Sequence, residues 1–142
     1  MPEDHKSLLR RFYDEVNADN LAAMDELLAD DLIEHEETPG LKPNKEGVKQ
    51  FFAMFRSAFP DLHIDAHEML TDGDLVCARI TTTGTHQGEF LGIPPTGKRI
   101  EVDAIDIVRM RDGQAVEHWG VTDTIAMLQQ LGVVPEEAPA QP

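Results

Sequence analysis

Apolar residues recur with a helical period in the first part of this chain and with a period of two after Pro60. Between His5 and Asn17 they return every three or four residues, which gathers them on one side of a helix. This spacing predicts an amphipathic helix over residues 5–17, with its apolar face packed on the rest of the protein.

Two further helices are predicted before Pro60. Asn20 stands where its side chain can accept hydrogen bonds from free backbone N–H groups, so a short helix is expected over residues 21–28. Asn44 is the corresponding cap of a helix over residues 45–59. That helix carries four of the six phenylalanines and is expected to cover a sheet. Between these helices, residues 32–35 are a candidate short strand.

After Pro60 the alternation of apolar and polar residues predicts strands with one buried face. It runs through four segments, residues 62–71, 75–85, 99–111 and 114–122. Asp72-Gly73 and Asp112-Gly113 are expected to form tight turns, because both residue types tolerate positive φ. The four segments therefore form two antiparallel hairpins, followed by a closing helix over residues 124–131.

Helices that cover one side of an antiparallel sheet make an α+β layer architecture. We expect a curved, cone-shaped sheet with the N-terminal helices packed on its concave side and a mouth that holds a small ligand. The 142 residues, 41% of them hydrophobic, suit a single domain over residues 1–133. Residues 134–142 are rich in proline, glutamate and alanine and are expected to form a disordered C-terminal tail.

Composition narrows the range of partners. The chain has 12 basic and 27 acidic residues, and its net charge of -15 repels nucleic-acid phosphates and anionic membrane surfaces. Cys77 is the single cysteine, so an internal disulfide is excluded. The sequence shows neither a signal-peptide pattern nor an apolar run of the roughly 20 residues that span a bilayer. These features predict a soluble, cytoplasmic protein that binds neither nucleic acid nor a membrane.

Asp106 is the one charged residue on its predicted strand face, among apolar neighbours. A buried carboxylate is costly without a partner, so it needs either a catalytic task or a structural pair. If Asp112-Gly113 forms a tight turn, Asp106 lies near His118 or near Gly120, depending on the register. An acid–base pair of Asp106 and His118 inside the cavity is therefore expected.

Four other polar or aromatic residues each have a structural and a functional interpretation. Asp123 precedes the closing helix, so its carboxylate either caps that helix or acts as a further catalytic group. His86 either bonds to the backbone or contacts a ligand, and Trp119 either packs in the core or forms a pocket wall. His35 is expected at the cavity mouth, whereas the acidic residues 34, 36 and 37 around it are expected in solvent.

His63, Asp65 and His67 alternate along one strand, a spacing that a divalent metal can use. Their apolar neighbours Leu62 and Ile64 are expected on the core face of the same strand. The trio is therefore expected to face solvent or a second subunit, and no metal site is predicted.

Three segments carry a family resemblance: GTHQGEFLGIPPTGK from Gly84, DIVRMRDG from Asp106 and VEHWGVTD from Val116. They closely resemble the SnoaL-like polyketide cyclase family of the NTF2-like fold. The resemblance implies a cone-shaped α+β barrel, often a homodimer joined through the open sheet face. It also implies ring closure of a polyketide ester by an intramolecular aldol step, without metal or organic cofactor. The family's acid/base aspartate is implied directly after Glu-His-Trp, where this chain has Gly120.

The predicted function is thus cofactor-independent cyclase or isomerase chemistry on a small apolar carbonyl or polyketide-like compound, with acid–base catalysis. The catalytic candidates are Asp106, His118 and Asp123. The candidate substrate contacts are His35, Phe55, His86, Phe90 and Trp119.

Two alternatives stay open. The first is a non-catalytic ligand-binding or dimerisation module of the same fold. The second is an epoxide-hydrolase-like reaction that would use Asp106, Asp123 and Arg109. The parity of the strand counts against the hydrolase, because Arg109 falls on the face opposite Asp106.

Overall fold

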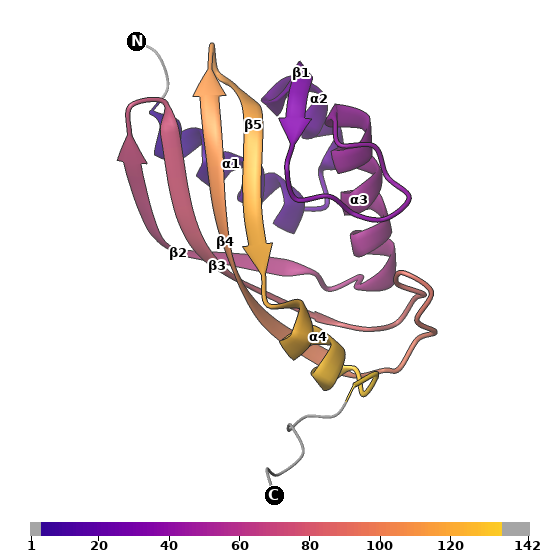
Figure 1. The fold of residues 1–142 in the computed structure, drawn as a ribbon. Helices are drawn as coiled ribbons and strands as arrows, with labels where there is room; N and C mark the ends of the chain where they lie inside the picture. Colours follow the sequence, from indigo (N-terminus) through magenta and orange to yellow (C-terminus); the bar gives the residue numbers. More distant parts are fainter. Residues whose placement is uncertain (1–3, 135–142) are drawn as a thin grey trace, which may run out of the picture.

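A computed structural model describes residues 4–134, which form one curved sheet with helices on its concave side (Figure 1). The five strands have the order β1-β5-β4-β3-β2; β1 runs parallel to β5, and all other neighbours are antiparallel. The strands are β1 (Leu28–Glu34), β2 (His63–Asp72), β3 (Leu75–Thr85), β4 (Arg99–Arg111) and β5 (Gln114–Thr122). The helices are α1 (His5–Asn17), α2 (Met24–Leu27), α3 (Lys45–Ala58) and α4 (Thr124–Gln130), with a 3-10 turn over Leu21–Ala23.

Most of the predicted elements are confirmed. The bounds of α1, β3, β4 and β5 are those the sequence predicts, and α3 and α4 end one residue earlier than predicted. Asn44 caps α3, since its side chain accepts a hydrogen bond from the N–H of Gly47. Asp112 and Gly113 both have positive φ and join β4 to β5 in a tight turn, whereas the β2–β3 turn is made by Gly73 and Asp74, one residue later than expected.

The segment after α1 differs from its prediction. Instead of a helix over 21–28 and a strand over 32–35, only two short helical turns form, and β1 already begins at Leu28. Asn20 does not cap; its side-chain amide donates to Glu15. The strand is longer than expected because β5 offers it a parallel partner, a long-range pairing that local propensity does not reveal.

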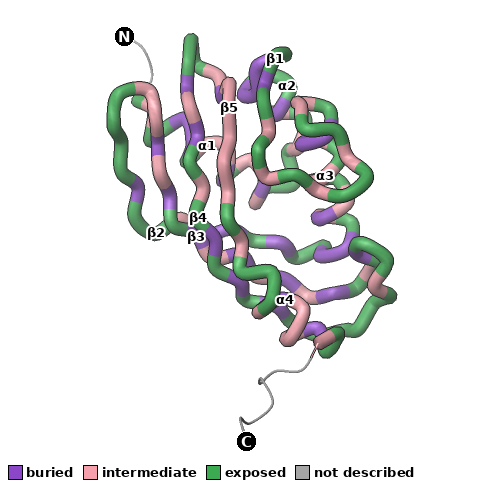
Figure 2. The backbone as a smooth tube through the Cα atoms, viewed as in Figure 1, coloured by how far each residue is buried: buried purple, intermediate pink, exposed green. Residues whose placement is uncertain are grey.

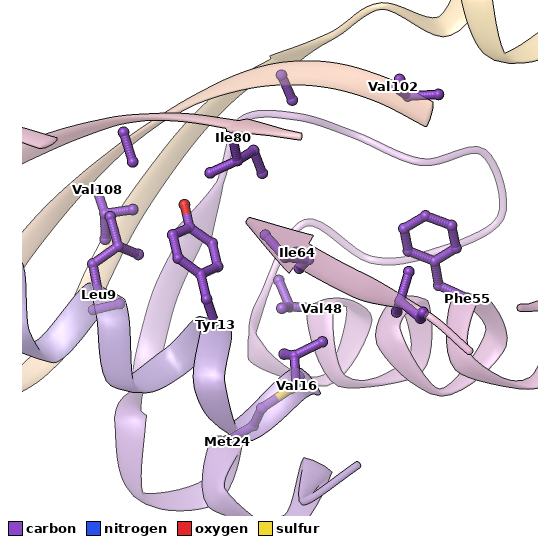
Figure 3. Close-up of a cluster of buried hydrophobic side chains, with 14 of the residues drawn as sticks. Leu9, Tyr13, Val16, Met24, Val48, Phe55, Ile64, Ile80, Val102 and Val108 are labelled. Atoms are coloured by element: carbon purple, nitrogen blue, oxygen red, sulfur yellow. The ribbon is translucent and has the colours of Figure 1, made fainter. Parts of the chain in front are cut away.

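The core lies between the concave sheet face and the helices. Along β4, Val102, Ala104 and Val108 are buried, whereas the alternate residues Asp103, Ile105 and Ile107 face outward, as the alternation predicts. Figure 2 shows the same alternation of buried and exposed positions along the strands. In Figure 3, Leu9 and Tyr13 of α1 point toward the sheet, close to Val108 and Ile80. This apolar packing holds α1 against the sheet and places its side chains next to the inward face of β4.

The register shifts at three points: between Leu28 and Ile33, between Ala66 and Met69, and between Arg109 and Met110. Such irregularities increase the local bend of a strand, which suits a sheet that curls around its helices. None of the helices within residues 4–134 combines the length and apolar character needed to cross a membrane. Of the predicted tail, residues 135–142 lie outside the described residues.

Candidate active site

A cavity of about 590 Å³ opens between the concave sheet face, α1, α3 and the loop after β1. Most of its lining is apolar and aromatic, and Phe55 and Phe90 stack there with their ring centroids 5.3 Å apart. Both phenylalanines therefore lie where the sequence expects substrate contacts. Seven ionisable side chains interrupt the apolar wall: Tyr13, Glu34, Glu36, Glu37, Lys42, Asp106 and His118. Of these, Glu34, Glu36, Asp106 and His118 form one cluster.

Asp106 projects from β4 into this cavity and is bonded at both carboxylate oxygens. Its Oδ1 lies 2.8 Å from Nε2 of His118, and its Oδ2 accepts a 2.6 Å hydrogen bond from the hydroxyl of Tyr13. In the strand register Asp106 pairs with Gly120, so His118 is its diagonal neighbour, two residues along β5. The sequence left these two registers open, and the structure combines them: the backbone of Asp106 faces Gly120 and its side chain reaches His118.

The His118 ring lies between two carboxylates. Its Nδ1 is 2.5 Å from Oε2 of Glu34, on the opposite side from Asp106. Only a doubly protonated ring donates to both acceptors. Burial by itself lowers the pKa of His118, but the hydrogen bonds to Asp106 and Glu34 outweigh it and raise that pKa to about 10. His118 is therefore a fixed cation at neutral pH rather than a free base.

Tyr13 supports Asp106 from α1. The sequence does not indicate this role, because the position of Tyr13 fits the apolar face of the helix. Burial, and then the negative charge of Asp106, raise the pKa of the Tyr13 phenol above its ordinary value. The hydroxyl stays protonated and remains a hydrogen-bond donor. This role of Tyr13 becomes visible only in the fold, where α1 packs on β2 and β3 and the Tyr13 hydroxyl reaches Asp106 of β4.

Glu36, expected in solvent, instead turns into the cavity and is partly buried. Its Oε2 accepts a 2.9 Å hydrogen bond from the Thr122 hydroxyl of β5. Burial raises the pKa of the Glu36 carboxyl, against a smaller lowering by that hydrogen bond. A Cβ at position 120 would overlap Oε1 of Glu36, so this carboxyl group occupies the space that any side chain of residue 120 would need.

Asp123 lies away from this cluster. It is exposed, does not line the cavity, and accepts a 3.0 Å hydrogen bond from the N–H of Ala126 at the start of α4. Of its two sequence interpretations, the structure supports the helix cap.

His35 and Trp119 lie on the outer side of the sheet rather than at the cavity. Their rings stack with centroids 5.0 Å apart, and Nε2 of His35 is 2.7 Å from Oε2 of Glu117. Arg109 lies over Trp119 and pairs with Asp74 and Glu117, on the face opposite Asp106 as parity predicts. The side-chain direction of Trp119 follows from strand alternation, since its neighbour His118 points inward.

His86 is fully buried and does not line the cavity. Its ring stacks on Phe59, and its Nδ1 contacts the hydroxyl and the backbone N–H of Thr96. The structural interpretation of His86 therefore fits its surroundings better than ligand contact. His63, Asp65 and His67 are exposed, and His67 contacts Thr81 while His63 contacts Asp65.

Comparison with known proteins places this chain in a family. The model of the SnoaL-like polyketide cyclases matches residues 7–131. The aklanonic acid methyl ester cyclase DauD of Streptomyces sp. (strain C5) is 29% identical over 131 residues, 88% of this chain and 80% of that protein. The aklanonic acid methyl ester cyclase DnrD of Streptomyces peucetius is 30% identical over 94 residues. That match covers 63% of this chain and 65% of DnrD, slightly less than two thirds of that enzyme.

The three-dimensional comparison agrees. The crystal structure of IdmH from Streptomyces antibioticus superposes with a TM-score of 0.80 and 34% sequence identity, covering 92% of this chain and 100% of that one. The curved sheet with helices on its concave side is the NTF2-like fold that the sequence predicts. With this fold and a family match over most of its length, the chain belongs to the SnoaL-like polyketide cyclase family.

Proposed function

We propose that this protein closes a ring in a small, apolar, polyketide-like ester by acid–base chemistry at the Asp106–His118 cluster, without a cofactor. The observation that carries the proposal is the 2.8 Å contact between these two side chains inside a largely apolar cavity of about 590 Å³. A cavity of this size suits a small organic molecule, and its apolar wall strengthens the electrostatic interactions of the few charges within it.

An aldol closure begins with loss of a proton from the carbon next to a carbonyl. Asp106 is the proposed base, because Tyr13 and His118 fix the orientation of its carboxylate toward the cavity. The negative charge then shifts to the carbonyl oxygen of the enolate. The cation of His118 lies in the same cluster, so it stabilises that charge through space without itself giving up a proton.

Aklanonic acid methyl ester is the first substrate to test, since it is named as the substrate of two curated relatives. We expect purified protein to convert it to a cyclised product of equal mass, resolved by liquid chromatography and mass spectrometry. Asp106→Asn should lower kcat by about 10²-fold or more, as removal of a general base does. Full activity of a folded Asp106→Asn variant would contradict the proposed role of Asp106.

Of the alternatives, a non-catalytic ligand-binding module predicts tight binding of the ester without conversion, so the same assay separates it from the cyclase. The epoxide-hydrolase alternative has little support from the geometry. Arg109 lies on the outer sheet face and Asp123 caps α4, so neither joins Asp106 in the cavity.

A homodimer through the outer sheet face is part of the proposal. Four side chains lie in one row across four strands, paired in register: Leu70, Cys77, Ile107 and Trp119. This outer-face row is flanked by further exposed apolar residues, Ile105 at 48% and Val121 at 76% exposure. Clustered exposed apolar residues on a sheet face mark protein interaction sites.

Two broader features remain predictions. We propose that residues 1–133 act as one domain, because the described helices and strands share one sheet and one core. A cytoplasmic setting is proposed as well, in which Cys77 stays a free thiol.

A further inference from the structure

The carboxyl group of Glu36 occupies the space that a side chain at position 120 would fill. Glu36 follows β1 and folds back over β5, where Thr122 binds its Oε2 and its Oε1 lies over the Cα of Gly120. Any side chain at position 120 would displace this carboxyl group. The absence of a side chain at Gly120 is therefore what allows Glu36 to enter the cavity.

The position of Glu36 brings it beside the acid–base cluster. One ligand atom each of Glu36, Asp106 and His118 lie within 4.8 Å of one another, and all three side chains line the cavity. A substrate that contacts Asp106 thus lies within reach of Glu36 too. The two carboxyl groups come from different elements, so they approach a substrate from different directions.

We propose that Glu36 is the second catalytic carboxyl group of this cavity and acts as the acid of the ring closure, an inference that rests on the proposed function. Three carboxyl groups, those of Glu34, Glu36 and Asp106, surround the single cation of His118. Glu34 and Asp106 are bonded to the cation, whereas Glu36 is bonded to the neutral hydroxyl of Thr122. Glu36 is therefore the carboxyl group best placed to carry a proton, because burial raises its pKa and outweighs the lowering by the Thr122 hydrogen bond and by the charge of His118. Repulsion from Asp106 and Glu34 adds a smaller rise to the pKa.

Asp106 and Glu36 then act as the base and the acid of the ring closure. Asp106 removes the proton from the carbon next to one carbonyl, and the resulting enolate carbon forms a bond to the carbon of the second carbonyl. The electron pair of that second C=O bond moves to its oxygen, which takes the proton of Glu36 and becomes a hydroxyl. The proton on Asp106 returns to Glu36 across the few ångströms between them, so the substrate is isomerised without any co-reactant.

The first test replaces the acid. With aklanonic acid methyl ester as the probe, Glu36→Gln should lower kcat by about 10²-fold with little change in KM, since the amide keeps the volume but cannot supply the proton. In the wild type, activity should fall as pH rises and Glu36 loses its proton, and this fall should disappear in Glu36→Gln, where only the fall at about pH 10 from loss of the His118 proton remains. Glu89→Gln is the matched control, because Glu89 is exposed and outside the cavity lining. Equal kcat in Glu36→Gln and the wild type would overturn the assignment.

The second test adds a side chain at position 120, in the space that the Glu36 carboxyl group occupies. Gly120→Ala should lower kcat at least to the level of Glu36→Ala, because the new methyl group displaces the carboxyl and also lies 2.9 Å from Cε1 of His118. The double variant Glu36→Ala/Gly120→Ala should be little worse than Gly120→Ala, since the methyl group already removes the Glu36 carboxyl from its place. Glu36→Ala/Gly120→Asp should recover part of the activity by supplying a carboxyl group from β5. If the fold-losses in kcat of the two single variants multiply in Glu36→Ala/Gly120→Ala, at unchanged thermal stability, the inference is contradicted.

A titration separates failure of this inference from failure of the proposed function. The Cδ signal of Glu36, assigned by its loss in Glu36→Gln, is followed by ¹³C NMR in protein without substrate. A midpoint above the ordinary range of glutamate supports Glu36 as the proton carrier, even if the ester is not the substrate. A midpoint at or below that range overturns the inference whatever the turnover assay gives. Lack of turnover by the wild type would instead count against the proposed function.

Discussion

The hydroxyl of Tyr13 donates a 2.6 Å hydrogen bond to Oδ2 of Asp106, joining α1 to β4 across 93 positions of sequence. The other oxygen of the same carboxylate accepts from His118, so a helix and a strand hold Asp106 from two sides. The apolar face of α1 thus serves both the core and the site.

Tyr13→Phe removes the donor and keeps the ring. We expect the free energy of unfolding to fall by about 2 kcal/mol, because hydrogen bonds to charged groups contribute roughly 1.5–3 kcal/mol. Urea denaturation at pH 7 measures this. Thr81→Val is the control, since it removes a hydroxyl–carboxylate bond to Asp103 in an exposed setting and should cost much less. Equal losses in the free energy of unfolding would mean that the buried Tyr13–Asp106 hydrogen bond stabilises the protein no more than the exposed one.

The protonation of His118 makes stability depend on pH. Its pKa rises from 6.5 in the unfolded chain to about 10 in the folded protein. The stabilisation is thus fully present below pH 6.5 and is lost as pH rises from 6.5 to about 10. Urea denaturation at pH 6 and pH 10 should show this loss in the wild type, and less of it in His118→Gln. Ring ¹⁵N shifts that indicate a neutral His118 at pH 7 would exclude the ion cluster.

Asp123→Ala tests the helix cap against a catalytic role. We expect a loss of about 1 kcal/mol in unfolding free energy, the usual cost of removing an N-cap, and kcat within twofold of the wild type. Asp123→Ser should restore the stability, because serine caps helices as well. A large fall in kcat at unchanged stability would show that Asp123 has a catalytic role.

Ile107→Asp tests the proposed dimer. A charge in the middle of the outer-face row should convert a dimer to a monomer, measured by size-exclusion chromatography with light scattering, because burying an unpaired carboxylate is costly. Ile125→Asp on α4 is the control, as Ile125 is exposed and apolar but lies outside the row. A wild-type protein that is monomeric at high concentration would refute the dimer directly.

Local pattern identified most of the secondary structure and both residues of the central pair, Asp106 and His118. Alternation along β4 and β5 assigned Asp106 and His118 to the inward face, and Asp112-Gly113 placed them near one another. It also put Arg109 on the outer face, which counted against a hydrolase. These predictions succeed because side-chain direction in a strand has a strict period of two.

Other site residues depend on contacts that no local pattern encodes. Glu36 reads as part of an acidic surface run, and it enters the cavity only because β1 pairs with β5 and Gly120 leaves the space empty. His35 was expected at the mouth, but it lies on the outer face against Trp119.

The sequence by itself determined the family, the α+β architecture, the strand faces and the candidate pair Asp106 and His118. The tertiary structure alone decided that Tyr13, Glu34 and Glu36 join them, since these residues come from elements separated by 70 or more positions along the chain. The physical reason is that strand alternation and helical period are local geometry. The protonation states of this cluster arise from burial and from charges that only folding brings together.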